Sequence, residues 1–140
     1  MYLLDTNVIS ETRKPRPHGA ILAWIGSLEP EQLALSAVTL GELQRGVERV
    51  RKQDAEKAEE IDAWIGKLSR SFEIIPVSGE IFRNWALLMK GRAPQAWEDV
   101  LIAATAQSHR LVVATRNVQD FAGLGVEIVN PFDFKARPGK

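Results

Sequence analysis

The sequence predicts an α/β fold in which a mostly parallel sheet is covered by helices on both faces. Two observations support this prediction. Five short apolar segments have the composition of buried strands, and segments whose apolar residues have helical spacing separate the first four of them. Residues 111–115 form a β-branched run of the kind found inside parallel sheets. Alternating strands and helices favour a parallel sheet, because each strand is then followed by a helix that covers one face.

The first strand is short and ends on an acid. Residues 2–4 are apolar and lead directly into Asp5, which is followed by two residues that favour turns and helix starts. Residues 11–19 are polar and contain two prolines, so we expect a loop there. Residues 20–28 space their apolar side chains like a helix that faces a core.

A second strand is expected over residues 33–38, followed by a helix that runs to about Lys52. Thr39 and Glu42 have the spacing of a capping box, in which two side chains satisfy backbone N–H groups at the start of a helix. Residues 53–71 are predicted to form an amphipathic helix, because apolar residues recur on one face. These residues are Ile61, Trp64, Ile65 and Leu68.

Pro76 indicates that the third strand, expected over residues 72–77, is short or lies at an edge of the sheet. Proline has no N–H group and cannot donate a hydrogen bond to a neighbouring strand. Ser78 is the expected cap of a helix that runs to about Lys90. The inward face of that helix is expected to hold Ile81, Trp85 and Leu88.

The last third of the chain is predicted to place one helix against the sheet and to add two strands. Residues 97–106 are rich in alanine, and small side chains allow a helix to approach a sheet closely. The strand over 111–115 follows, then a turn over 116–121 and a final strand over 126–129.

Length and composition indicate a globular protein. With 140 residues, we expect one domain over residues 1–134 and a flexible tail over 135–140. Hydrophobic residues make up 45% and charged residues 26%, which is ordinary for such a domain. The chain has no cysteine, which excludes disulfides, a thiolate nucleophile and cysteine-ligated zinc.

Charge and hydropathy restrict the partners. Eighteen basic and eighteen acidic residues give no net charge, so a nucleic-acid partner would need a local basic patch. No apolar run is long enough to span a bilayer, and the strand-like start with its acid does not resemble a signal peptide. We therefore expect a cytoplasmic protein without a membrane partner.

Three acids stand at equivalent places in the predicted fold. Asp5 ends the first strand, Glu42 opens the helix after the second, and Asp99 opens the helix before the fourth. The carboxyl ends of parallel strands meet at one edge, where α/β proteins bind ligands. Carboxylates gathered there repel one another, so their pKa values rise or a cation neutralises them. Oxygen ligands without histidine or cysteine favour Mg²⁺ or Mn²⁺, which can activate a water near a phosphodiester.

Each acid also has a purely structural explanation. Asp5 can cap a helix that starts near Asn7, and Glu42 can complete the capping box. Asp99 can complement the dipole of its helix, an effect of about 0.3–1 kcal/mol. The two histidines, His18 and His109, have no metal-site or triad spacing and are expected at the surface.

Four stretches together resemble PIN-domain proteins of the VapC/FitB toxin type. They are Leu3-Leu-Asp-Thr-Asn-Val-Ile-Ser10, Leu35-Ser-Ala-Val-Thr-Leu-Gly-Glu-Leu-Gln-Arg-Gly46, Asp99-Val-Leu-Ile-Ala-Ala-Thr-Ala106, and Val113-Ala-Thr-Arg-Asn-Val-Gln-Asp-Phe121 with Val129-Asn-Pro131. The resemblance implies a three-layer α/β/α fold with a five-stranded parallel sheet. It also implies a Mg²⁺- or Mn²⁺-dependent endoribonuclease that is the toxin of a type II toxin–antitoxin pair and forms a homodimer.

The resemblance also assigns site residues. The family's first three acids correspond to Asp5, Glu42 and Asp99, as metal ligands and catalytic residues. A fourth position, where relatives carry aspartate, falls on Asn117 with Asp120 nearby. Expected partners are RNA and a cognate antitoxin that places a helix, often with an arginine, near the acidic pocket. Candidate contacts to RNA phosphates are Arg13, Lys14, Arg45 and Arg116.

Two other functions remain open at this stage. Asp5 could be the nucleophile of a phosphohydrolase or phosphoacceptor, although such sites commonly need a second acid where this chain has Asn7. The protein could instead be a non-catalytic module that binds a small protein partner. The candidate anchors for a partner or a second copy are Trp24, Trp64, Trp85 and Trp97.

Overall fold

The computed structural model describes residues 1–136 and contains one five-stranded sheet in which every strand pair is parallel. The strands are β1 (Tyr2–Leu4), β2 (Leu33–Ser36), β3 (Glu73–Ile75), β4 (Val112–Ala114) and β5 (Ile128–Val129). Their order across the sheet is β3-β2-β1-β4-β5. The predicted α/β fold is confirmed, and β3 lies at an edge, as Pro76 indicated.

Helices connect these strands. They are α1 (Thr6–Glu11), α2 (Gly19–Gly26), α3 (Ala37–Arg51), α4 (Ala55–Ser71), α5 (Gly79–Leu88), α6 (Trp97–His109) and α7 (Val118–Phe121). Single 3₁₀ turns cover Pro30–Gln32, Pro94–Ala96 and Pro131–Asp133. No helix within residues 1–136 is both long and apolar enough to cross a membrane. Of the tail predicted over 135–140, residues 137–140 lie outside the described part of the chain.

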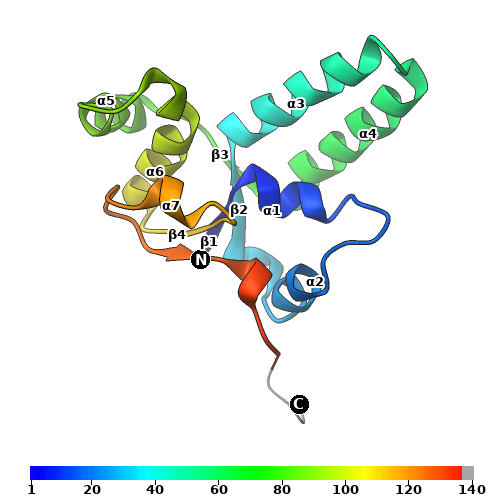
Figure 1. Cartoon of the computed structure of the whole chain (residues 1–140), viewed down its shortest axis with the longest axis horizontal. Helices are drawn as coiled ribbons and strands as arrows, with labels where there is room; N and C mark the ends of the chain where they lie inside the picture. Colours follow the sequence, from blue (N-terminus) through cyan, green and yellow to red (C-terminus); the bar gives the residue numbers. More distant parts are fainter. Residues whose placement is uncertain (137–140) are drawn as a thin grey trace.

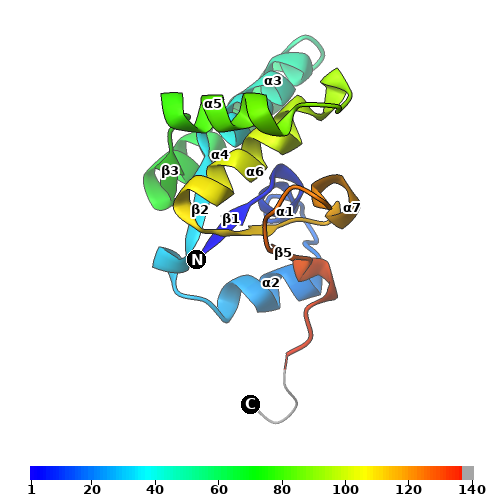
Figure 2. The same ribbon diagram turned by 90° about the vertical axis from the view of Figure 1, so that its left-hand side faces the viewer.

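The two faces of the sheet build separate cores. Successive residues of a strand point to opposite faces, so Leu3 packs with α6 and α7 while Leu4 packs with α1 and α2. Ala103 and Ala106 of α6 are fully buried against the sheet, as their small size predicted. Figure 2 shows α5 and α6 on one side of the strands and α2 on the other. The fold is therefore a three-layer α/β/α arrangement.

The start of α3 differs from the prediction. The capping box of Thr39 and Glu42 is wrong, because the N-cap is Ser36, three residues before Thr39, and the helix begins at Ala37. The Ser36 hydroxyl accepts a 3.1 Å hydrogen bond from the backbone N–H of Val38. Thr39 is instead buried, with a hydroxyl that has no partner among the described residues. Glu42 consequently lies in the second turn of α3, free of any capping role.

Helices α3 and α4 form a hairpin that projects from the body of the molecule (Figure 1). Their facing sides have a small core of their own, made of Val47, Ala58, Ile61 and Ile65. At the tip, Arg51 lies within ion-pair distance of Glu48, Glu59 and Asp62, at 3.0, 2.7 and 3.0 Å. This cluster ties the end of α3 to the first half of α4.

The strand order places a topological switch point at the centre of the sheet. The chain runs outward from β1 through β2 to β3, and then returns to β4 on the other side of β1. Leu4 pairs with Ala114, so the residues that follow them, Asp5 and Thr115, leave adjacent strands side by side. Ligands of open α/β sheets bind in the crevice beyond such a point.

Candidate active site

Asp5 lies at the floor of this crevice and is 5% exposed. Its backbone N–H continues the sheet by donating to the carbonyl of Ala114 at 2.9 Å. Its Oδ1 accepts from the N–H of Thr6 at 2.9 Å, so Asp5 does cap α1, which starts at Thr6. Burial raises the pKa of Asp5, although the hydrogen bonds that it accepts oppose this effect. The helix cap and a role in a site are therefore compatible in the same residue.

A polar network holds the Asp5 carboxylate in place. Its Oδ2 accepts from the hydroxyl of Thr115 at 2.8 Å and from the amide of Asn7 at 3.2 Å. The carbonyl oxygen of the Asn7 side chain accepts from the N–H of Arg116 at 3.1 Å. The Thr115 hydroxyl also accepts from the N–H of Asn117 at 3.0 Å. These contacts join the end of β1 to the segment after β4, so neither can move without the other.

Glu42 reaches the crevice from α3 and is half-buried. Burial, a hydrogen bond with Glu98 and the nearby charges of Glu98 and Asp5 raise the pKa of Glu42 to about 8. The two glutamates come from different helices, α3 and α6, and lie close to one another. The Thr6 hydroxyl lies beside Glu42 and lowers its pKa, but makes no hydrogen bond of full geometry.

Asp99 lies in the first turn of α6 and is also half-buried. Burial raises its pKa to about 6, with further contributions from the charges of Asp5, Asp120 and Glu98. Asp120 also contributes to the raised pKa of Asp5. The acids that were 37 and 57 positions apart in the sequence therefore lie close enough to repel one another, as the sequence predicted.

In the described part of the chain, ion pairs do not compensate the negative charge of these acids. Within residues 1–136, none of the ion pairs involves Asp5, Glu42, Asp99 or Asp120. Buried carboxylates without a cationic partner are costly unless they are protonated or bind a metal. The ligands on offer are oxygens only, which suits Mg²⁺ or Mn²⁺.

The side chains are gathered but do not form a closed metal cage. In the described residues, no three acidic, histidine or cysteine side chains are close enough together to hold one ion by themselves. Mg²⁺ usually keeps several waters and uses only one or two protein carboxylates. The buried Thr6 hydroxyl, which lacks a full hydrogen bond, leaves a further oxygen in the crevice. The residues present therefore fit a hydrated divalent ion.

Two residues, Asn117 and Asp120, lie at the fourth polar position that the sequence predicted. Asn117 precedes α7 but is exposed, and its side chain makes no capping hydrogen bond. Asp120 lies one turn further on and carries the charge that acts on Asp5 and Asp99. The negative charge of this corner of the crevice thus comes from Asp120, while the backbone of Asn117 supports Thr115.

Of the four predicted phosphate contacts, only Arg45 lies within ion-pair distance of one of the clustered acids in residues 1–136. Arg45 approaches Glu98 at 3.8 Å and its side chain is 65% exposed. Arg116 lies over the ring of Phe132, and Arg13 lies beside the ring of Trp64. Lys14 pairs with Glu11 at 2.9 Å. All four cations are exposed.

Sequence reasoning did not identify Thr115 and Glu98. Thr115 directly follows a strand next to β1, and that position was the available signal, but strand adjacency is set only by the fold. Glu98 was not identified, because nothing local in the sequence indicates that α3 brings Glu42 close to it.

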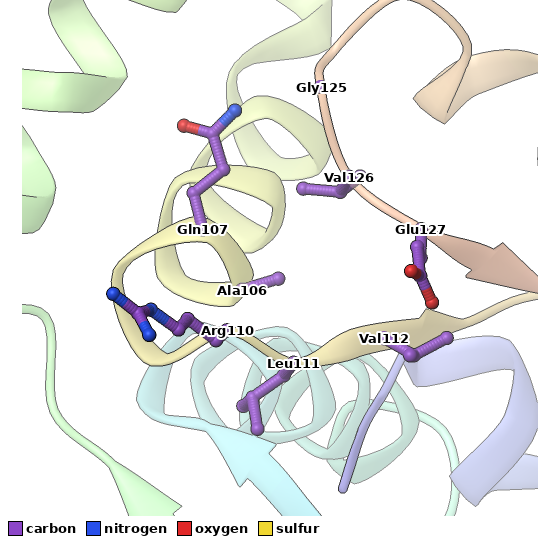
Figure 3. A pocket seen from close by; sticks show the side chains of 8 residues that line it. All are labelled: Ala106, Gln107, Arg110, Leu111, Val112, Gly125, Val126 and Glu127. Carbon is purple, nitrogen blue, oxygen red and sulfur yellow. The ribbon is translucent and has the colours of Figure 1, made fainter.

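A second pocket lies at the opposite edge of the sheet, before the first residues of β4 and β5 (Figure 3). It has a volume of about 320 Å³ and is bounded by the end of α6 and by the turn at Gly125. Arg110 and Glu127 are its charged residues. It does not gather acids and lies away from the switch point, so the crevice around Asp5 is the better candidate for a catalytic site.

A parallel sheet with an acidic crevice at its central switch point is the arrangement expected of a metal-dependent nuclease of the family that the sequence resembles. The chain belongs to the PIN-domain family, whose profile matches residues 2–125. It is 36% identical to VapC ribonuclease Y4jK of Sinorhizobium fredii, over 95% of this chain and 99% of that protein. It is 35% identical to the toxin FitB of Neisseria gonorrhoeae, over 94% of this chain and 99% of that protein.

The solved structures agree with this assignment. A structure of FitAB bound to an IR36 DNA fragment contains a chain that superposes with a TM-score of 0.83 at 32% identity. The match covers 98% of this chain and 99% of the other. The family that the sequence motifs suggested is therefore confirmed.

Proposed function

We propose that this chain is a Mg²⁺- or Mn²⁺-dependent endoribonuclease and the toxin of a toxin–antitoxin pair. The observation that carries the proposal is the convergence of Asp5, Glu42 and Asp99 in one crevice of a PIN fold. Two relatives matched over nearly their whole length are named as a VapC ribonuclease and as a toxin, which supports the same function. Such an enzyme would act on RNA in the cytoplasm.

The acids have distinct roles in this proposal. Asp5 and Asp99 hold the divalent ion, and Glu42 either holds it or orients the attacking water. When bound, the ion lowers the pKa of a water and stabilises negative charge on the phosphodiester. Thr115 and Asn7 position Asp5 through the hydrogen bonds that its Oδ2 accepts. Asp120 adds negative charge, and Asn117 assists at the same corner.

The protein partners belong to the proposal as well. The structures that this chain resembles include a toxin–antitoxin complex from Klebsiella pneumoniae and VapBC-5 from Mycobacterium tuberculosis, a member of the VapBC family of toxin–antitoxin systems, which supports a cognate antitoxin. A homodimer is supported by exposed apolar side chains on and near α5, where Phe82 is 48% and Leu87 61% exposed. Trp97 is exposed nearby, whereas Trp24 is buried and Trp64 and Trp85 are half-buried.

The phosphoacceptor alternative has less support. Both carboxylate oxygens of Asp5 already accept hydrogen bonds, and the residue is 5% exposed, so a nucleophilic oxygen is poorly accessible. The position where a second acid would be expected holds Asn7, which bonds to Asp5 and Arg116 instead. A phosphoaspartate trapped on Asp5 would favour this alternative.

RNA-end mapping tests the main proposal. Purified protein freed of any partner is incubated with RNA and Mg²⁺ or Mn²⁺, beside Asp99→Asn and the control Asp133→Asn. Asp133 is an exposed acid in the C-terminal 3₁₀ turn. We expect Asp99→Asn to reduce cleavage by on the order of a hundredfold, as the loss of one electrostatic group in an active site typically does. Asp133→Asn should cleave like the wild type.

The proposal is wrong if the wild type produces no new RNA ends with either ion. It is also wrong if Asp99→Asn and Asp133→Asn cleave equally well, because the activity would then come from elsewhere on the chain or from a contaminant.

A further inference from the structure

We infer that the outer face of α3 is an RNA-binding track that guides a single strand into the acidic crevice. The track consists of Arg45, Arg49 and Lys52. This inference rests on the proposed ribonuclease function, and it names where the substrate lies outside the site of cleavage.

Two hollows on the surface connect the crevice to this face. The first has a volume of about 460 Å³ and a mainly apolar wall that includes Phe82 and Trp97, with Glu42, Glu98, Gly41 and Arg45 also lining it. The second, of about 510 Å³, runs along α3 and is lined by Gly41, Gln44, Arg45, Glu48, Arg49 and Lys52. Gly41 and Arg45 belong to both, so the two hollows adjoin each other on α3, between Glu42 and the end of the helix.

Glu48, the acid that lines the second hollow, is paired with Arg51. Arg51 donates to both carboxylate oxygens of Glu48, at 3.0 and 3.2 Å, and Gln44 donates to the same group at 2.9 Å. Arg51 also binds Glu59 and Asp62 on α4. Arg49 and Lys52 have no ion-pair partner among residues 1–136. Their charges are therefore available to a ligand.

The spacing of the cations suits an extended polyanion. Arg45, Arg49 and Lys52 recur at intervals of four and three residues, which places them on one face of the helix. Seven residues of helix rise about 10.5 Å, so the track can contact more than one phosphate of a strand. Arg45, with only a 3.8 Å contact to Glu98, is the member of the track nearest to the acids.

The proposed occupant is RNA, because the exposed cations of the track suit contacts to the phosphate groups of a nucleic-acid backbone. Exposed lysine and arginine side chains position phosphates without reading sequence, and this chain has no net charge that could attract RNA in general. A local basic row that leads to the acidic crevice supplies that attraction. The track should therefore increase affinity for longer RNA without adding sequence specificity.

The test compares Arg49→Gln/Lys52→Gln with the control Lys67→Gln/Arg70→Gln, which removes two exposed cations from α4. Binding of a single-stranded RNA of about twenty nucleotides is measured in the Asp99→Asn background, where the RNA stays intact, over a range of salt concentrations. Each lost phosphate contact lowers the salt slope of log K by about 0.7, so we expect the track variant to lose about 1.4 and the control none.

Cleavage gives a second readout in the otherwise wild-type chain. The kcat/KM for the long RNA is divided by that for a short RNA that fills only the crevice. We expect this ratio to fall in the track variant and to stay constant in the control. The single variant Lys52→Glu should lower it as well, so the test does not depend on the folding of the double variant.

The outcomes separate this inference from the proposed function. Suppose that the wild type cleaves RNA, and that the track variant matches the control in the salt slope of log K and in the kcat/KM ratio. The inferred RNA-binding track is then wrong, and the proposed ribonuclease function is unaffected. If the wild type cleaves no RNA, the proposed function fails. If the track variant loses binding to the antitoxin but keeps its RNA slope, the face belongs to a protein partner and the inference is overturned.

Discussion

Thr115 donates a 2.8 Å hydrogen bond to the carboxylate of Asp5, although 110 positions separate the two residues in the chain. The bond crosses the topological switch point between β1 and β4. It links the most deeply buried acid of the crevice to the segment that leads into α7. Because the bond lowers the pKa of Asp5, it also favours the ionised form that would bind a cation.

The first prediction concerns this bond. Thr115→Val keeps the shape of the side chain but removes the donor to Asp5 and the acceptor for the N–H of Asn117. We expect the free energy of unfolding to fall by about 1–3 kcal/mol, the cost of leaving buried polar groups without partners. RNA cleavage should fall as well. Urea unfolding and initial cleavage rates measure the two effects.

Thr115→Ser is the matched control, since it keeps the hydroxyl. It should retain most of the activity. Equal activity in Thr115→Val and the wild type would mean that the bond does not position Asp5 for the reaction.

The second prediction separates Asp120 from Asn117. Asp120→Asn removes the charge that acts on Asp5 and Asp99, so we expect Mn²⁺ affinity to fall by about 10–100-fold, the usual effect of losing a group that supports a metal site. Asn117→Ala should have a smaller effect, because its side chain carries no charge and makes no capping bond. Isothermal titration with Mn²⁺ measures both. A larger loss in Asn117→Ala would assign the fourth position to Asn117.

The third prediction concerns stability and pH. In the metal-free protein the pKa of Glu42 is raised from 4.5 to about 8, and that of Asp99 from 3.8 to about 6. Between the ordinary and the raised pKa values, the folded state binds more protons than the unfolded state. The free energy of unfolding must therefore fall as the pH rises through this window. We expect a lower Tm in EDTA at about pH 8 than at about pH 5.

A divalent ion should reverse this trend, because it binds the ionised carboxylates. The gain in Tm on adding Mn²⁺ should therefore be larger at high pH. Asp99→Asn should flatten the decline in EDTA, since it removes one of the repelling charges. A Tm in EDTA that rises steadily from acid to neutral pH would contradict the mutual repulsion of these acids.

The fourth prediction concerns the start of α3, which carries Glu42. Ser36→Ala removes the N-cap hydrogen bond to Val38 and should lower the free energy of unfolding by about 1 kcal/mol. Thr39→Val removes a buried hydroxyl that has no partner in the described part of the chain, so it should be neutral or stabilising. Urea unfolding of the two variants decides between the caps. The opposite ranking would restore the capping box expected from the sequence.

Local sequence patterns were sufficient to predict most of the fold. The apolar runs around Leu3, Ala34 and Val113 are long enough to be buried, and the chain alternates them with helices, so a parallel sheet is the arrangement that covers both faces. The boundaries were less certain. The second strand ends at Ser36 rather than at residue 38, because the serine hydroxyl can cap a helix three residues earlier than Thr39 could.

What the sequence determined by itself was therefore the set of elements and the place of Asp5, Glu42 and Asp99 among them, because periodicity and strand ends are local properties. Only the tertiary structure decided that Thr115 holds Asp5, that Glu98 meets Glu42 and that Asp120 supplies the nearby charge. These contacts depend on which strands and helices become neighbours. Neighbours are chosen by the packing of the whole sheet, and no short stretch of the chain contains that information.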